Sequence, residues 1–308
     1  MKTEAIFMGS LIVLAVVLSL ARRKPDMPLE NFISYKKPTL WWFVDSEPNA
    51  RNWWDFGART SEEPNRGYLA IALEAVRRTQ SQDFAIVPLI GRDATLRMLT
   101  NPPSSAKQLP PALWRSFVMS SLLNQQGGLV MDGNSTLCVG PSLYPHVKDV
   151  EAAAFGVHPA EPVANPDLAV APGPAPYVAW AAKSHHPAWA AAAHTWTTLV
   201  EAGPQAWSSA VARRTELKVW EIQKTQGLQT IRGIDGTRLQ SGLPRQLEDL
   251  VGRVSVPPDP KIALSPETVF VSYDGDDLAR RFELNWFLRL SPDQIKSSDL
   301  VWAQYAGY

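Results

Sequence analysis

One carboxylate and one amide, Asp132 and Asn134, lie two residues apart and together could bind a hard divalent cation. A glycine pair, Gly127 and Gly128, and a short apolar run come directly before them. Oxygen atoms are the ligands that such cations prefer, although an amide oxygen is neutral. A strand-end carboxylate beside two glycines would leave room for a diphosphate. The alternative is structural, because Asp-Gly-Asn is also a favourable turn sequence.

A second acidic group, Asp274–Asp277, could supply the charge that Asn134 lacks. It holds three carboxylates in four residues, and these repel one another unless a cation or a helix N-terminus compensates. We therefore consider Asp274 and Asp276 as further metal ligands beside Asp132. The alternative is that the group caps the helix that follows.

That following helix is predicted over Leu278–Leu290, with Asp276 or Asp277 as its N-cap residue. Arg280 on the helix could bind a phosphate group. An arginine four residues after an acid is also an ordinary surface pair on a helix, so both interpretations of Arg280 stay open.

Three more residues are candidates for the same site. His185 precedes a helix that begins at Pro187, and its imidazole could join the metal or simply belong to the helix entry. Asp45 and Arg51 lie in a loop rich in tryptophan, where a base or a sugar ring could stack on an indole. Core packing is the commoner use of such tryptophans.

The elements that must position these residues follow an α/β pattern. Apolar runs at 40–44 and 83–90 predict strands, and helical spacing over 68–78 predicts the helix between them. A strand, helix, strand order indicates a right-handed crossover in a parallel sheet. Further helices are predicted over 111–126, 187–200, up to about 224 and from Ser291 through Trp302, with a short one at 92–99 and a strand at 268–273.

This order resembles the DXD-containing sugar transferases of the capsular-polysaccharide-synthesis and initiation-mannosyltransferase type. In that family a helix runs into Gly-Gly, an apolar strand and Asp-x-Asp, which match Gly127, Gly128 and Asp132, with Asn134 in place of the second acid. Two later turns are similar as well. They lie at 184–189 and 203–207, so the resemblance covers roughly residues 40–225.

The resemblance implies a GT-A fold, in which helices flank a Rossmann-type sheet. It also implies a nucleotide-sugar donor bound through Mn²⁺ or Mg²⁺, a glycan or lipid acceptor, and retention of anomeric configuration. It identifies no nucleophile or base in this chain.

One helix departs from the family pattern. The family's helix before Gly-Gly carries an Asp and, three residues later, an Arg that hold the donor; Ser116 and Met119 occupy these positions here. Arg115 could substitute, although a shift of one residue turns a side chain by about 100° around a helix.

Two functions follow from these observations. The first is a metal-dependent retaining glycosyltransferase that uses a nucleotide sugar. The alternative is a membrane-anchored scaffold protein, built on a catalytically degenerate glycosyltransferase fold and assembled with other proteins into a larger structure. Asn134, Ser116 and Met119 favour the alternative.

The N-terminal segment predicts a membrane anchor. Residues 5–21 are uncharged and apolar, and three cations follow at 22–24. Seventeen residues is the lower limit for a spanning helix. A cleaved signal peptide would have its cations before the apolar run. The order here predicts a single-pass anchor over 1–24, a linker over 25–39 and a glycosyltransferase-like domain over 40–308 on the cytoplasmic side.

The composition of the chain argues against some classes of partner and site. The chain has 30 basic and 30 acidic residues, so no overall field attracts nucleic acid. Its single cysteine, Cys138, excludes an intramolecular disulfide and a cysteine-based zinc site.

Overall fold

The computed structural model describes residues 37–45, 67–155, 177–236, 246–254 and 263–308. Residues 37–308 form one compact unit, which takes in the last residues of the predicted linker. The predicted anchor and Arg51 lie outside the described residues. Among the helices described, none is both long and apolar enough to cross a bilayer.

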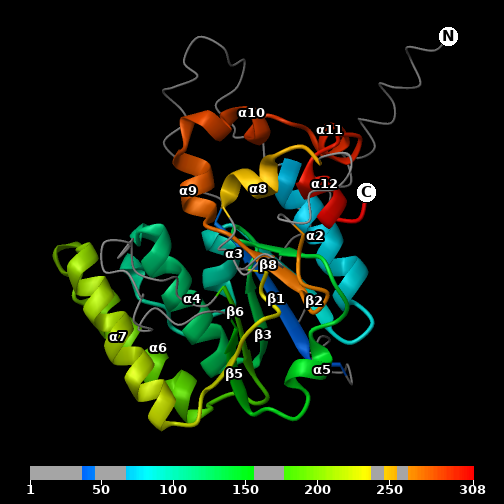
Figure 1. Ribbon diagram of the computed structural model, residues 1–308. Coiled ribbons are helices and arrows are strands. Elements are labelled where there is room, and N and C mark those ends of the chain that lie inside the picture. The colour runs from blue at the N-terminus through cyan, green and yellow to red at the C-terminus, as the bar shows by residue number, and fades with distance from the viewer. Residues whose placement is uncertain (1–36, 46–66, 156–176, 237–245, 255–262) are drawn as a thin grey trace, which may run out of the picture. The chain divides into compact units, whose positions relative to one another are not determined.

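A six-stranded mixed sheet forms the centre of this unit, in the order β2-β1-β3-β6-β5-β7 (Figure 1). The strands are β1 Thr39–Val44, β2 Ala85–Ile90, β3 Gly128–Asp132, β5 Ala152–Phe155, β6 Val178–Ala181 and β7 Gln229–Ile231. β1 is parallel to both β2 and β3, and β5 is parallel to β7. β6 is antiparallel to β3 and β5. The α/β class and the parallel first crossover are therefore confirmed.

Successive side chains of β1 alternate in direction and so contribute to the core on both faces of the sheet. Trp41 and Phe43 point to one side of the sheet, and Leu40, Trp42 and Val44 point to the other. Successive side chains of a strand face opposite ways, so a strand that is apolar throughout must be covered on both faces. Trp41 and Trp42, two of the four tryptophans that could have stacked on a ligand, are thus core residues; the other two, Trp53 and Trp54, lie outside the described residues.

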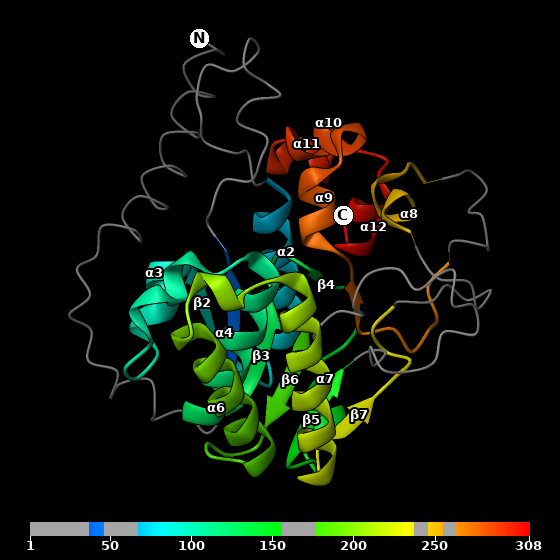
Figure 2. The ribbon, with the colours of Figure 1, turned by 90° about the vertical axis from the view of Figure 1, so that its left-hand side faces the viewer.

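Helices cover each face. On one face, α4, α6 and α7 pack around Trp41 and Phe43, and α6 contacts both α4 and α7 (Figure 2). On the opposite face α2 and the C-terminal helices pack around Trp42. The helices named here are α2 Gly67–Gln80, α3 Arg92–Arg97, α4 Pro111–Gln125, α6 Pro187–Glu201 and α7 Ser209–Thr225, all close to their predicted ranges. Shorter ones are α5 Tyr144–Val147 and α8 Leu247–Val251, with 3-10 turns η3 Ser104–Gln108 and η5 Pro204–Ala206.

The predicted helix over 278–290 is wrong as a single element. α9 Gly275–Arg280 ends where Arg281 is extended (φ −71°, ψ 118°), and η7 Phe282–Leu284 and α10 Asn285–Leu288 follow. Leu278 of α9 and Leu284 of η7 both belong to the core, although at six residues apart they would face different sides of one continuous helix.

The final predicted helix is also divided, into α11 Pro292–Lys296 and α12 Val301–Tyr305. Between them the backbone around Leu300 pairs with the strand-like residues near Arg253. This pairing requires extended backbone, and Trp302 therefore belongs to the second helix.

A two-stranded antiparallel sheet joins the motif to the C-terminal region. It pairs β4 Thr136–Cys138, which follows Asn134, with β8 Phe270–Ser272. The Asp-Gly-Asn turn therefore leads from one sheet to another and does not close a hairpin. Burial raises the pKa of the Cys138 thiol to about 12, which leaves it unreactive at neutral pH.

Candidate functional site at the strand ends

The order of the parallel strands places a topological switch between β1 and β3. The chain passes from β1 to β2 on one side and later to β3 on the other. In open α/β sheets, ligands bind outside the carboxyl ends of strands at such a switch. Asp45 directly follows β1 and Asp132 ends β3, so both lie at this edge.

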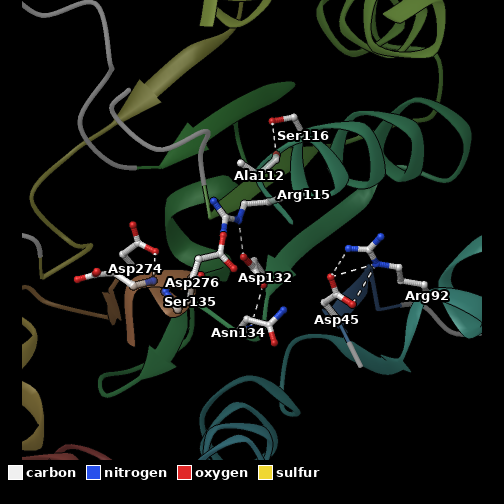
Figure 3. Close-up of polar contacts among 12 residues, drawn as sticks. Asp45, Arg92, Ala112, Arg115, Ser116, Asp132, Asn134, Ser135, Asp274 and Asp276 are labelled. Carbon is white, nitrogen blue, oxygen red and sulfur yellow. Dashed lines mark hydrogen bonds and ion pairs between the residues drawn. The ribbon is translucent and has the colours of Figure 1, made fainter. Parts of the chain in front are cut away.

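A cluster of three charged groups, two of them buried, occupies the edge (Figure 3). Arg115 Nε donates a hydrogen bond to Asp132 Oδ2 at 2.6 Å, and Arg115 Nη2 donates to Asp276 Oδ2 at 3.3 Å. Asp132 itself is only 1% exposed. Residues from α4, β3 and α9, distant in sequence, thus meet around one guanidinium group.

Helical geometry explains how Arg115 reaches Asp132. It lies four residues before Met119, which is about one helical turn, so the two share a face of α4. The side chain of Ser116, the next residue, is turned from that of Arg115 by about 100° around the helix axis. Its hydroxyl donates a hydrogen bond to the carbonyl of Ala112 at 3.2 Å. Arg115 therefore lies on the same face of α4 as Met119, one turn earlier in the helix.

The surroundings of Arg115 favour its charged form. Burial acts against the charge, but Asp132, Tyr177 and Asp276 outweigh it, so the pKa of Arg115 is raised. Its guanidinium carbon lies 4.7 Å from the centre of the Tyr177 ring. Burial raises the pKa of Asp276, against the opposing effect of Arg115.

The segment Asp274–Asp277 does fold back onto the motif. Tyr273 donates its backbone N–H to the carbonyl of Ser135 at 2.9 Å. A side chain on Gly275 would overlap the backbone carbonyl of Asn134, so only glycine permits this approach. This close contact brings Asp276 to Arg115.

The cap of α9 differs from the prediction. Asp274 is the N-cap residue, and its Oδ1 accepts from the backbone N–H of Asp277 at 2.9 Å. Asp276 and Asp277 lie in the first turn, where negative charge is also favourable.

The residues present do not fit a divalent cation. One carboxylate oxygen of Asp132 binds Arg115, and the other accepts the backbone N–H of Asn134 at 2.9 Å. The Asn134 amide points away from Arg115 (Figure 3), and the Asp274 carboxylate caps α9. The part of the chain that the structure describes contains no group of three or more His, Cys, Asp or Glu that could hold a metal ion.

His185 lies at the other end of the sheet. β6 is antiparallel to β3, with Val178 opposite Met131 and Ala181 opposite Gly128. His185 follows Ala181, is exposed, and donates its backbone N–H to the carbonyl of Asn124 at 2.7 Å. The antiparallel course of β6 thus separates it from the strand-end carboxylates.

Asp45 is held by an arginine in the structure. Arg92, at the start of α3, donates to both of its carboxylate oxygens, at 2.7–3.1 Å. Arg92 also donates to the carbonyls of Lys107 and Leu109 and lies over the ring of Trp114. This pair connects the ends of β1 and β2 to the segment before α4.

Arg280 remains close to the cluster. It is exposed at the end of α9, and its charge acts to lower the pKa values of Asp276 and Asp277. The ordinary surface pair is made by its neighbour Arg281, which lies 3.7 Å from Asp277.

Sequence reasoning missed Glu216 on α7. Burial raises its pKa to about 7, although Arg213 and Arg115 act to lower it, so Glu216 lies within electrostatic reach of the cluster. The sequence carries no signal for this, because a glutamate on an amphipathic helix usually faces water. The burial of Glu216 depends on where α7 packs.

We expect Glu216→Gln to flatten the pH dependence of stability. Between pH 4.5 and about 7 the folded protein retains a proton that the unfolded chain has released. The free energy of unfolding therefore falls as pH rises through this interval. The variant should match the wild type near pH 4 and exceed it near pH 8 in urea unfolding. The exposed Glu221→Gln is the control, and an equal response of both variants would contradict the expectation.

No family model, curated protein or solved structure matches this chain.

Proposed function

We propose that this chain is a glycosyltransferase-type protein with a GT-A-like fold, which binds a nucleotide sugar outside the ends of β1 and β3. One observation carries the proposal: the Asp132–Arg115–Asp276 cluster, with two of its groups buried, lies at the topological switch. Burying charges is costly, and it recurs at functional sites because ligands need fixed charges there.

The chemistry of the cluster suits a sugar. Carboxylates accept hydrogen bonds from hydroxyl groups, and a guanidinium group donates them in a fixed plane. The Arg115 side chain is 9% exposed and that of Asp276 is 26% exposed. Asp276 is therefore the member that a ligand can reach, and Arg115 holds it in place.

Positive charge for the leaving nucleoside diphosphate would come from arginines. The charge of exposed Arg280 acts on Asp276, and Arg115 pairs with Asp276 at 3.3 Å. Fixed cations stabilise negative charge as it develops in a transition state. No step is assigned to Mn²⁺ or Mg²⁺, since Arg115 already takes the place beside Asp132.

The second candidate is the scaffold protein on a degenerate transferase fold. It is favoured by Asp132, whose two oxygens are both engaged within the protein. Under either candidate we propose that residues 5–21 anchor the chain, with its body on the cytoplasmic side. Partner proteins of a larger assembly belong to the second candidate.

Binding of nucleotide sugars separates the two candidates. We expect UDP- or GDP-sugars to raise the melting temperature of the full chain in detergent and to be slowly hydrolysed, without added metal. Asp276→Asn should weaken binding by about 10- to 100-fold, the effect of losing a hydrogen bond to a charged group. The exposed Asp149→Asn should leave binding unchanged.

Three outcomes would count against the proposal. Binding that requires Mn²⁺ would refute the role given to Arg115. No binding or hydrolysis with any sugar nucleotide, with or without metal, would leave the scaffold candidate. Equal losses in Asp276→Asn and Asp149→Asn would place the ligand elsewhere.

A further inference from the structure

Two large aromatic side chains, four residues apart, are exposed on the C-terminal helices. Phe282 is 66% exposed and Trp286 is 46% exposed. They lie four residues apart across η7 and α10, a spacing close to one helical turn. Leu284 and Phe287 on the inner side are buried, which fixes the outward direction of the exposed face.

Positive charge accompanies this face. The segment 280–289 contains three arginines and one glutamate, Glu283. Arg280 and Arg289 are exposed at its two ends. Arg281 instead pairs with Glu248 of α8, which ties α9 and its neighbours to the body.

We propose that the α10 face, defined by Phe282, Trp286 and Arg289, docks on the surface of a lipid bilayer. Tryptophan and phenylalanine favour the membrane interface, where the ring is shielded from water and its edge stays near the headgroups. Arginines beside them are attracted to anionic lipid headgroups. An exposed aromatic pair with Arg289 on the same segment is thus suited to an anionic bilayer.

The length of the N-terminal chain limits how far the body can lie from a bilayer. Twelve residues lie between Lys24 and Lys37, where the compact unit begins. Fully extended they span at most about 45 Å. If residues 5–21 cross the bilayer, the body stays within this distance of it, and the α10 face adds a second contact that orients the body. Docking does not depend on the proposed transferase function.

A site-specific label tests the contact. The only native cysteine, Cys138, is buried, so a thiol-reactive environment-sensitive fluorophore will label an introduced cysteine. We would label Trp286→Cys in the full chain, reconstituted in phosphatidylcholine vesicles with and without phosphatidylserine. Glu221→Cys, exposed on α7, is the control.

In the vesicles containing phosphatidylserine, docking predicts a blue shift in the emission of the fluorophore at position 286. Nitroxide-labelled lipid should also quench this fluorophore several-fold more strongly than the one at position 221. Phe282→Cys should behave like Trp286→Cys, which guards against local damage by one substitution. Equal quenching at positions 221 and 286 would overturn the proposal. So would a blue shift that appears without vesicles and grows with protein concentration, since it would show a protein partner.

Discussion

Arg115→Met is expected to lower the free energy of unfolding by about 3–5 kcal/mol, the usual cost of removing one partner of a buried ion pair. The methionine fills most of the arginine volume, so the loss arises mainly from charge. Asp132 would stay buried without its cation and keep only the backbone N–H of Asn134. Urea unfolding followed by circular dichroism measures the loss.

Two further variants make this expectation specific. Replacing the pair together, as Arg115→Met with Asp132→Leu, should recover much of the loss, because neither charge is then left buried. Arg97→Met, on the exposed side of α3, should stay within about 0.5 kcal/mol of the wild type. A double variant as unstable as Arg115→Met would show that the pair is not the source of the effect.

Gly128→Ala is expected to cost about 2–5 kcal/mol, for two additive reasons. Gly128 has φ +89°, a conformation that costs other residues about 1–2 kcal/mol. An added methyl group would also overlap the carbonyl of Thr39 on the neighbouring strand β1, and overpacking costs about 1–3 kcal/mol.

Gly227 offers a matched control for the second contribution, the steric overlap of the added methyl group. It lies between α7 and β7, as Gly128 lies at the end of the connection from α4 to β3, and it has φ +83°. A methyl group there would have no neighbour within 4 Å, so Gly227→Ala should cost only the backbone term. Equal losses in the two alanine variants would contradict the close approach of Gly128 to β1.

The conformation of Gly127 and Gly128 also explains why the sequence alone predicted a turn at this glycine pair. Gly127 and Gly128 both have positive φ, and the carbonyl of Gly127 accepts the Trp41 indole N–H at 2.9 Å. The turn must be left-handed and must pass close to β1. Only glycine satisfies both requirements, so the residue type itself reports the structure.

Other candidate residues could not be placed in this way. His185 was grouped with Asp132 from its family-like turn, but the antiparallel β6 carries it to the opposite sheet end. From the sequence, the direction of the Arg115 side chain was judged from the adjacent Ser116, which faces another side of the helix. Met119, one turn later, is the residue that shares a face of α4 with Arg115. Glu216 was not recognised at all, because its partial burial depends on how its own helix, α7, packs in the fold.

The sequence by itself determined the α/β class, the first parallel crossover, the glycine turn and the main helices, since these depend on local periodicity and on residues with special backbone freedom. Only the tertiary structure decided the site. It showed that Asp276 meets Arg115, that Arg115 pairs with Asp132, and that the helix after Asp274 breaks at Arg281. These outcomes depend on contacts between segments up to 161 residues apart, for which no local pattern carries information.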